Sequence, residues 1–462
     1  MRVYDPGTFF DEGVTADGTP RPAWKQVLES VSLDPAGTLA NSRQLVRERE
    51  IAFGAGEAKQ DFVLDPIPRI IEAAEWAELE PGLAQRARAL NALLADVYGE
   101  RRIVSEGTIP KRVIHGAEYL EPEMDGLVGA TPATVIGFDL VRDSDGRFVV
   151  LEDNTRTPSG MAYAVAARQV SAQLLGDEAE RAEPLDPVFG WLADALRGAA
   201  PEGADEPNVV LLSDGPDNSA WYEHVEVAKR IGIPLLQPHD LESGGDELRY
   251  RDADAALRRA DVVLRRTNAD RITERGKGIT WVGEKLYGPL RNGKLRMVNT
   301  FGSGLADDKL VYAYVPDAIR FYLSEEPLVG QIPTLDCADE ASLERVIQAP
   351  HELVVKPRSE SGGVGVVVGS QATPAELGAC VDLVTGSPQD YIAQEIVSIS
   401  TAPTVAGDAI EPRHVDLRAF AVCDATGVRL MPGGLTRVAL TKGSLVVNSS
   451  QGGGGKDTWV MK

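Results

Sequence analysis

The first quarter of the chain shows apolar positions with a helical period, after a short irregular arm. Residues 1–20 are rich in glycine, aspartate and proline and predict an arm without regular structure. Helical patterns then dominate to about residue 100. The clearest runs from Pro81 to Tyr98, where apolar residues recur every three or four positions and Gly99 follows as a stop signal. Pro81 is expected in the first turn, where a helix tolerates proline.

The period changes to that of a β-strand in the next part of the chain. Residues 133–153 hold two β-rich runs on either side of the turn sequence 143–146, which predicts a β-hairpin. A helix is expected over about 161–175. Residues 177–206 predict a short helix followed by a linker.

Strand-like and helical runs alternate from residue 208 to about residue 300. This order predicts a small unit with a parallel sheet. One further helix is expected over 308–323. From His351 to its end the chain is rich in β-forming residues and glycine.

Charge and cysteine content limit the kinds of binding partner and the cellular environment that we expect. The formal net charge of −23 repels phosphate backbones and anionic membranes, so we expect neither nucleic-acid nor membrane binding. The three cysteines are odd in number and far apart, which argues against a disulfide framework and indicates a reducing, cytoplasmic environment. The N-terminal residues lack the apolar run of a signal peptide, and we expect no membrane span.

Asp139, Glu152 and Asn154 form the first group of residues with candidate chemistry. Because side chains alternate along a strand, Glu152 and Asn154 share a face and Asp153 points away. The hairpin places Asp139 roughly opposite them. Two carboxylates and an amide oxygen suit Mg²⁺ bridging the phosphates of a nucleotide, whereas a solvated hairpin with acidic edges is the alternative. The turn at 154–160, which leads into a helix, can present backbone N–H groups to an anion.

A second group lies where a β run delivers Lys356 and a glycine-rich loop follows. Gly362, Gly363 and Gly365 allow backbone N–H groups to approach phosphate oxygens, and the lysine supplies a positive charge. The spacing is not that of a Walker A loop, since a strand and not a helix follows. A glycine-rich hairpin without a ligand is the alternative interpretation.

Two further motifs lie downstream. An apolar run is interrupted by Gln394 and Glu395, and a strand leaving its sheet at this point can pair its backbone with an adenine edge. The strongly alternating run 415–422 sets Asp416 and Arg418 on one face.

Taken in order, these motifs resemble those of the ATP-grasp fold, in which two α+β subdomains clamp ATP. The DDK sequence at 307–309 resembles an earlier phosphate-binding lysine. Residues 138–160 resemble the metal module of D-alanine–D-alanine ligase and glutathione synthetase. In ordinary ATP-grasp enzymes that module comes last, whereas here it precedes both lysines and the chain closes with a glycine loop at 448–459. The chain is therefore similar to the circularly permuted ATP-grasp family, which is related to glutathionylspermidine synthases.

The resemblance implies an α+β, circularly permuted ATP-grasp fold with an inserted small Rossmann-like α/β domain and an N-terminal helical region. We accordingly expect four parts: an arm and helical region at 1–125, a metal-binding hairpin module at 126–180, a small α/β substrate domain at 208–305, and the lysine, glycine-loop and adenine-hinge part at 306–462.

The resemblance also implies roles at the matching positions. The acidic group of the hairpin would hold Mg²⁺. The expected nucleotide contacts are Lys309, Lys356, Ser361, Gly362, Gly363, Gly365, Gln394, Glu395, Val397, Asp416 and Asn448, and the expected catalytic cations are Lys356, Arg418, Arg437 and Arg156. One position departs from the pattern: Gly137 stands where D-alanine–D-alanine ligase carries an arginine, and Arg156 and Arg437 are the candidates to replace it.

The implied activity is ATP- and Mg²⁺-dependent ligation of a carboxylate to an amine through an acyl phosphate, with small-molecule substrates. Asn218, Arg265, Arg266 and Ser303 are the expected substrate contacts, because a carboxylate favours a bidentate guanidinium. Two alternatives keep the same ATP clamp. One is phosphoryl transfer to an acceptor that is not a carboxylate, and the other is a nucleotide-binding partner protein without catalysis.

Overall fold

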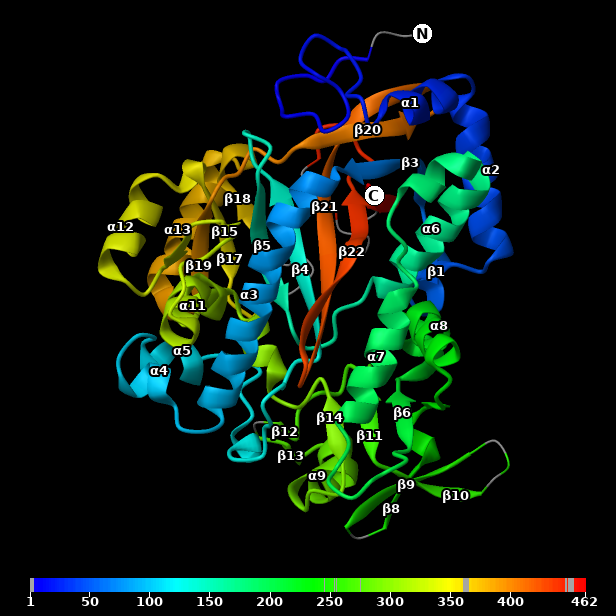
Figure 1. Ribbon diagram of the computed structural model, residues 1–462. Coiled ribbons are helices and arrows are strands. Elements are labelled where there is room, and N and C mark those ends of the chain that lie inside the picture. Colours follow the sequence, from blue (N-terminus) through cyan, green and yellow to red (C-terminus); the bar gives the residue numbers. More distant parts are fainter. Residues whose placement is uncertain are drawn as a thin grey trace.

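A large mixed sheet forms the centre of the molecule (Figure 1). The computed structural model describes residues 4–462 apart from 245, 253, 255, 275, 360–364, 445–446 and 448–452. The strand order is β15-β5-β4-β21-β22-β23-β3, and β20 pairs with β21. The strands are β3 (Leu64–Ile71), β4 (Val135–Arg142), β5 (Phe148–Asn154), β15 (Gly330–Gln331), β20 (Thr401–Ala406), β21 (Ala409–Asp424), β22 (Gly427–Val438) and β23 (Gly454–Val460).

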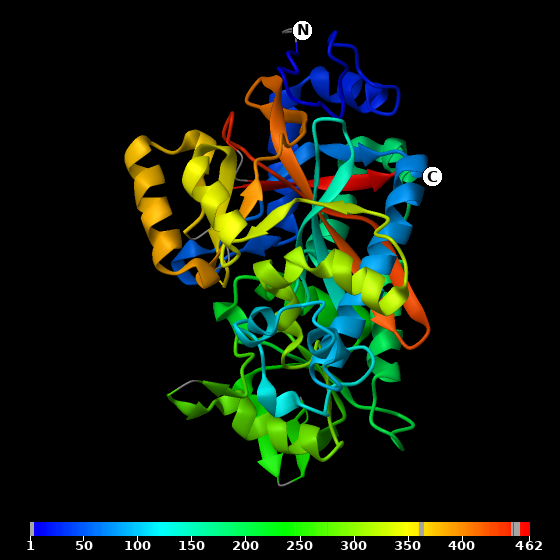
Figure 2. The same cartoon turned by 90° about the vertical axis from the view of Figure 1, so that its left-hand side faces the viewer.

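A second, four-stranded antiparallel sheet lies beside the central one. Figure 2 shows it with its two helices as a yellow-to-orange layer. Its order is β16-β19-β17-β18, with β16 (Thr334–Asp336), β17 (Leu353–Pro357), β18 (Val367–Val368) and β19 (Tyr391–Glu395). The helices are α12 (Glu340–Gln348) and α13 (Pro374–Gly386).

The parallel sheet expected over 208–300 is present, in the order β14-β11-β6-β7 (Figure 1). Its strands are β6 (Val209–Leu212), β7 (Leu235–Leu236), β11 (Val262–Arg265) and β14 (Arg296–Val298), with α8 (Trp221–Ile231) and α9 (Gly288–Arg291) beside them. Small antiparallel pieces accompany it: β8 (Leu241–Gly244), β9 (Glu247–Arg251), β10 (Leu257–Ala260), β12 (Thr273–Glu274) and β13 (Gly278–Ile279).

Helices cover both faces of the central sheet. α3 (Ala73–Val97) packs against one face, where Arg86 pairs with the buried Asp153 at 2.6 Å. α6 (Met161–Leu175) and α7 (Pro187–Gly198) pack with Phe420 against part of the other. The remaining elements are α1 (Lys25–Ser32), α2 (Pro35–Glu48), α4 (Arg102–Ser105), α5 (Lys111–His115), α10 (Lys309–Ala313), α11 (Val315–Leu323), β1 (Ala52–Phe53) and β2 (Gln60–Asp61).

The hairpin and the helix after it form where the sequence predicts them, since β4, β5 and α6 match the expected ranges. Three expectations were wrong. Pro81 is not in the first turn of its helix: α3 begins eight residues earlier, at a capping box of Glu72 and Glu75, and burial of Trp76 and Leu79 outweighs the backbone hydrogen bond that proline removes.

The second error concerns residues 64–71, which we expected to be helical. They form the edge strand β3, which holds two prolines because an edge strand leaves N–H groups unpaired. The third is the part after His351, where α13 interrupts the β-rich region with a Thr373–Glu376 capping box and Pro374 in its first turn. The helix expected over 308–323 is divided at Tyr314 into α10 and α11. Among the described residues, none of the helices combines the length and apolar character needed to cross a bilayer.

Candidate active site

The acidic group of the hairpin lies on one face of the central sheet. Asp139 of β4 is directly opposite Glu152 of β5, and Gly137 is opposite Asn154. A bulge directly after this pair shifts the register, so that Leu140 is opposite Val150. The predicted shared face of Glu152 and Asn154 is thereby confirmed.

Two arginines extend this row of polar side chains across the neighbouring strands. Arg418 of β21 is opposite Asp139 and donates from Nε to Oδ1 at 2.6 Å and from Nη2 to Oδ2 at 2.8 Å. Arg437 of β22 is opposite Asp416; its Nε donates to Asp416 Oδ1 at 2.8 Å, and its Nη2 to Asp139 Oδ2 at 2.8 Å. Asp139 thus accepts hydrogen bonds from two guanidinium groups while it is almost fully buried.

The two facing carboxylates have opposite pKa shifts. Burial would raise the pKa of Asp139, but Arg418 and Arg437 outweigh burial, so the pKa is lowered and the group is ionised. Burial raises the pKa of Glu152, and the charge of Asp139 raises it further. Lys309, Arg418 and Lys356 lower it, so Glu152 lies within electrostatic reach of all three cations. Burial also raises the pKa of Asp416.

Lys356 reaches the site from β17 of the second sheet. Its Nζ donates to Gln394 Oε1 at 2.5 Å, and Gln394 Nε2 donates to Thr334 Oγ1 at 2.9 Å. Burial lowers the pKa of Lys356 to about 8; Glu152 opposes this shift and the positive charge of Lys309 adds to it. Lys309 begins α10, so residues from four separate parts of the chain meet here: the β4–β5 hairpin, α10, β17, and β21 with β22.

Part of the expected nucleotide contacts lies outside the described residues: Ser361, Gly362, Gly363 and Asn448. Gly365 is described and has φ +69, and a Cβ there would lie 2.7 Å from Pro357 Cγ, so this turn requires glycine. β19 ends at Glu395, which is exposed, and Val397 follows after the strand has left the sheet. Residues 395–397 therefore occupy the strand end at which adenine is expected.

The donor set of the hairpin fits a magnesium ion. Mg²⁺ prefers oxygen ligands, and proteins usually bind it through one or two carboxylates. Within the described ranges no group of three or more His, Cys, Asp or Glu residues could hold a metal, so the candidate set is two carboxylates and the Asn154 amide. The buried Nδ2 of Asn154 has no hydrogen-bond partner among those residues, so neighbouring protein groups do not fix this amide.

Arg156, Arg265 and Ser303 cluster beside this face, on the side of the parallel sheet. Arg156 pairs with Asp270 at 3.0 Å and stacks on the Tyr119 ring at 4.4 Å. Arg265 donates from Nη2 to Arg156 O at 3.3 Å, and burial lowers its pKa to about 10. The Oγ of Ser303 is buried without a partner among the described residues.

Arg266 and Asn218 are held by neighbouring protein groups. Arg266 donates to Pro158 O and Ser159 Oγ, each at 2.7 Å, and to Glu223 Oε1 at 2.9 Å. Asn218 is buried and donates to Asp214 Oδ2 at 3.0 Å. Both side chains thus already have hydrogen-bond partners within the protein.

The anion expected at the 154–160 turn is a side chain of the protein itself. Glu223 Oε2 accepts from the backbone N–H of Gly160 at 2.8 Å and of Ala162 at 3.0 Å, at the start of α6. Sequence reasoning missed Glu223 because it lies on α8, 63 residues away along the chain. No local pattern signals such a contact.

Asp307 is a second residue that the sequence reasoning passed over. Its Oδ1 accepts from Thr155 N at 2.5 Å, Thr155 Oγ1 at 2.7 Å and Arg156 N at 3.1 Å. Burial raises its pKa to about 6, these hydrogen bonds and Arg156 oppose the shift, and Glu152 adds to it. The DDK sequence at 307–309 is the local signal for Asp307 as well as for Lys309.

Gly137 has no space for the arginine that the resemblance implies at this position. A Cβ on Gly137 would lie 2.9 Å from Pro158 Cβ and 3.6 Å from Arg418 Cδ. Arg418 approaches Asp139 from the neighbouring strand instead, as does Arg437.

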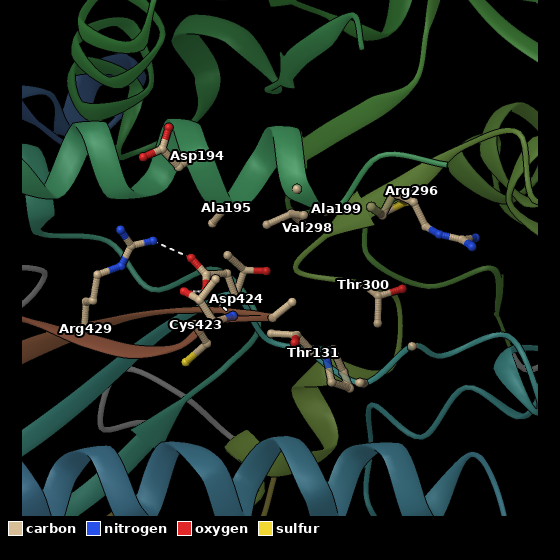
Figure 3. Close-up of a pocket in the computed structure, with 18 of the residues that line it drawn as sticks. Thr131, Asp194, Ala195, Ala199, Arg296, Val298, Thr300, Cys423, Asp424 and Arg429 are labelled. Atoms are coloured by element: carbon tan, nitrogen blue, oxygen red, sulfur yellow. Dashed lines mark hydrogen bonds and ion pairs between the residues drawn. The ribbon is translucent and has the colours of Figure 1, made fainter. Parts of the chain in front are cut away.

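A cavity of about 470 Å³ lies apart from this polar row (Figure 3). Thr131, Asp424 and Arg429 are among the residues that line it, together with the end of α7, and Arg429 is paired with Asp424. None of the residues that we assign to metal or phosphate binding lines it. The candidate active site is therefore defined by its polar groups, and the cavity does not identify it.

Comparison with known proteins identifies the family to which the chain belongs. Residues 68–439 match the family "Circularly permuted ATP-grasp type 2", and the chain belongs to that family. An uncharacterised protein of Synechocystis is 39% identical over all of this chain and 99% of its own length. An uncharacterised protein of Mycobacterium leprae is 38% identical over 98% of this chain and 82% of its own length.

A protein of Frankia alni with the provisional name glutamate–cysteine ligase 2-3 is 40% identical over all of this chain, which matches 55% of that protein. A glutathione synthetase-like effector of Globodera pallida has a similar fold, with a TM-score of 0.60 and 11% identity over 94% of this chain and 97% of its own. Family and fold agree in identifying a circularly permuted ATP-grasp protein.

Proposed function

We propose that this protein is an ATP- and Mg²⁺-dependent ligase that joins a carboxylate to an amine through an acyl phosphate and releases ADP and phosphate. One observation carries the proposal: a row of two carboxylates, an amide and two arginines on the central sheet faces two lysines from other parts of the chain. Family membership and the provisional ligase name of the Frankia relative support it.

Asp139, Glu152 and Asn154 would hold Mg²⁺, which would supply positive charge to the phosphates of the nucleotide. Lys309 and Lys356 would bind the phosphates, while Glu395 and Val397 would offer backbone groups to adenine. We also propose that the 208–305 unit contributes the substrate contacts and that residues 306–462 contribute the nucleotide contacts.

The reaction needs positioning and charge more than covalent help from the protein. A carboxylate oxygen of the substrate attacks the γ-phosphorus, and ADP leaves. Arg418 and Arg437 stabilise the negative charge that develops on the transferring oxygens, and both are already oriented by Asp139. The amine then attacks the acyl carbon, and phosphate leaves.

Of the expected substrate contacts, Arg265 and Ser303 fit best. Each has a buried polar atom without a hydrogen-bond partner in the described part of the chain. Arg156 lies next to them with a quarter of its side chain exposed, which favours contact with a substrate carboxylate.

Hydroxylamine trapping tests the acyl phosphate. The protein is incubated with ATP, Mg²⁺ and a small-molecule extract, with and without hydroxylamine, and products are analysed by mass spectrometry. A ligase yields an ATP-dependent hydroxamate, because hydroxylamine intercepts the activated carboxylate. A stable phosphorylated product with no hydroxamate would instead indicate phosphoryl transfer to another acceptor, and ATP binding without any product would indicate a non-catalytic protein.

A further inference from the structure

A buried ion pair joins the two segments that carry the candidate phosphate-binding lysines. Arg358 lies two residues after Lys356, and Asp308 directly precedes Lys309. Arg358 Nε donates to Asp308 Oδ1 at 2.8 Å and to Oδ2 at 2.7 Å. Both side chains are less than a tenth exposed, so this pair is shielded from solvent.

Each partner is fixed at its own end. Asp308 is the N-cap of α10, since its Oδ1 accepts from Leu310 N at 2.9 Å and Val311 N at 3.2 Å. The backbone N–H of Arg358 donates to Asp390 O at 2.8 Å, next to β19. The guanidinium therefore connects the second sheet directly to the first turn of α10, the helix that begins at Lys309.

The surroundings of Arg358 leave it little freedom. Its Nη2 donates to Val113 O of α5. A Cβ on Gly116 would lie only 2.6 Å from its Nη1, so glycine at that position leaves the space that the guanidinium fills. Burying the Arg358–Asp308 pair costs free energy that a pair on the surface would not cost. A role in positioning is consistent with that cost.

We infer that Arg358 and Asp308 are positioning residues that set Lys356 and Lys309 at a fixed separation, so that both ammonium groups engage one nucleotide together. This inference rests on the proposed function and names neither residue as a contact of ATP. Lys309 and Lys356 both act on the charge of Glu152, which agrees with their meeting at one place.

Calorimetric titration with a non-hydrolysable ATP analogue and Mg²⁺ tests the inference, with thermal unfolding measured on the same samples. Asp308→Asn keeps a side chain that can cap α10 but removes the charge, and Arg358→Gln removes the other partner. Each single variant is expected to bind the analogue at least tenfold more weakly. Arg345→Gln, which breaks an exposed pair between α12 and Glu352, is the matched control and should bind as the wild type does.

The double variant Asp308→Asn/Arg358→Gln separates positioning from stability. It no longer buries an unpaired charge, so its unfolding temperature should recover toward the wild-type value. Its affinity should stay as low as that of the single variants, because the same link is missing. Recovery of affinity together with stability, or single variants that bind as the wild type does, would overturn the positioning role. A wild-type protein that binds no nucleotide would instead overturn the proposed function, and this inference with it.

Discussion

Arg418 donates two hydrogen bonds to Asp139, across the pair of central strands that holds the candidate active site. Arg437 donates to the same carboxylate from the next strand. Both oxygens of Asp139 are therefore in contact with cations while the nearby Glu152 is not fixed in the same way. Under the proposed function, a bound metal ion would meet a carboxylate that is already ionised, and the transferring phosphate would meet two arginines that Asp139 already orients.

Arg418→Gln should lower ATP turnover by roughly 10²-fold, because a preorganised donor to the developing charge is lost. The folded state should persist, since Arg437 still pairs with Asp139. Phosphate release in the presence of extract measures the effect. Arg102→Gln, on an exposed helical pair with Glu106, is the control and should keep wild-type turnover. Equal turnover in Arg418→Gln would exclude this arginine from the reaction.

Nucleotide affinity should depend on pH through Lys356. Burial lowers the pKa of this lysine to about 8, so its ammonium is charged below that pH and neutral above it. Binding of an ATP analogue should therefore weaken as the pH rises through about 8. In Lys356→Arg the side chain keeps its charge, and the alkaline loss of affinity should disappear. An identical alkaline loss in both proteins would assign the titration to another group.

Substitutions at two neighbouring residues of β5 should have different effects on the stability of the fold. Asp153 faces α3 and forms a buried pair with Arg86, so Asp153→Ala should destabilise the fold by about 3–5 kcal/mol. Glu152 faces the site and no hydrogen bond within the described residues fixes it, so Glu152→Gln should unfold near the wild-type temperature. Thermal unfolding of the two variants checks this contrast, and it fails if Glu152→Gln loses as much stability as Asp153→Ala.

Restoring the arginine that is absent at position 137 should harm the protein. Gly137→Arg places a Cβ 2.9 Å from Pro158 Cβ and brings a third guanidinium beside Arg418. We expect a lower unfolding temperature and loss of ADP formation. Gly378→Arg is the control, since a Cβ there meets open space on α13. Higher activity in Gly137→Arg would show that the site lacks an arginine that it can accommodate.

The parts of the fold that could be predicted are those with a strong local signal. The β4–β5 hairpin has alternating apolar residues around a turn sequence, and α6 follows a Pro-Ser-Gly turn. The prediction of a first turn at Pro81 failed because proline can lie either in the first turn of a helix or inside it. Only the tertiary packing of Trp76 and Leu79 decides between these two positions. The start of α13 has a capping box at Thr373 and Glu376, which is a recognisable helix signal in the sequence. The region was predicted to be β-rich because the residues around it favour strands.

The site was predictable only where its residues share a strand or a recognisable motif. Asp416 and Arg418 are two positions apart on β21, so their common face follows from alternation alone. The contacts of Glu223 with α6 and of Arg358 with Asp308 join segments 50 or more residues apart. Such contacts depend on how the sheets pack, and periodicity carries no information about them.

Nucleotide turnover in a small-molecule extract, with wild type and Glu152→Gln side by side and ADP resolved from AMP, tests the central claim most directly. Glu78→Gln, an exposed position on α3, is the control and should behave as the wild type does. A ligase of this type should form ADP and phosphate only when extract is present, and Glu152→Gln should form neither. AMP and pyrophosphate, equal turnover in Glu152→Gln, or ATP binding without turnover in any of the three proteins would contradict the account.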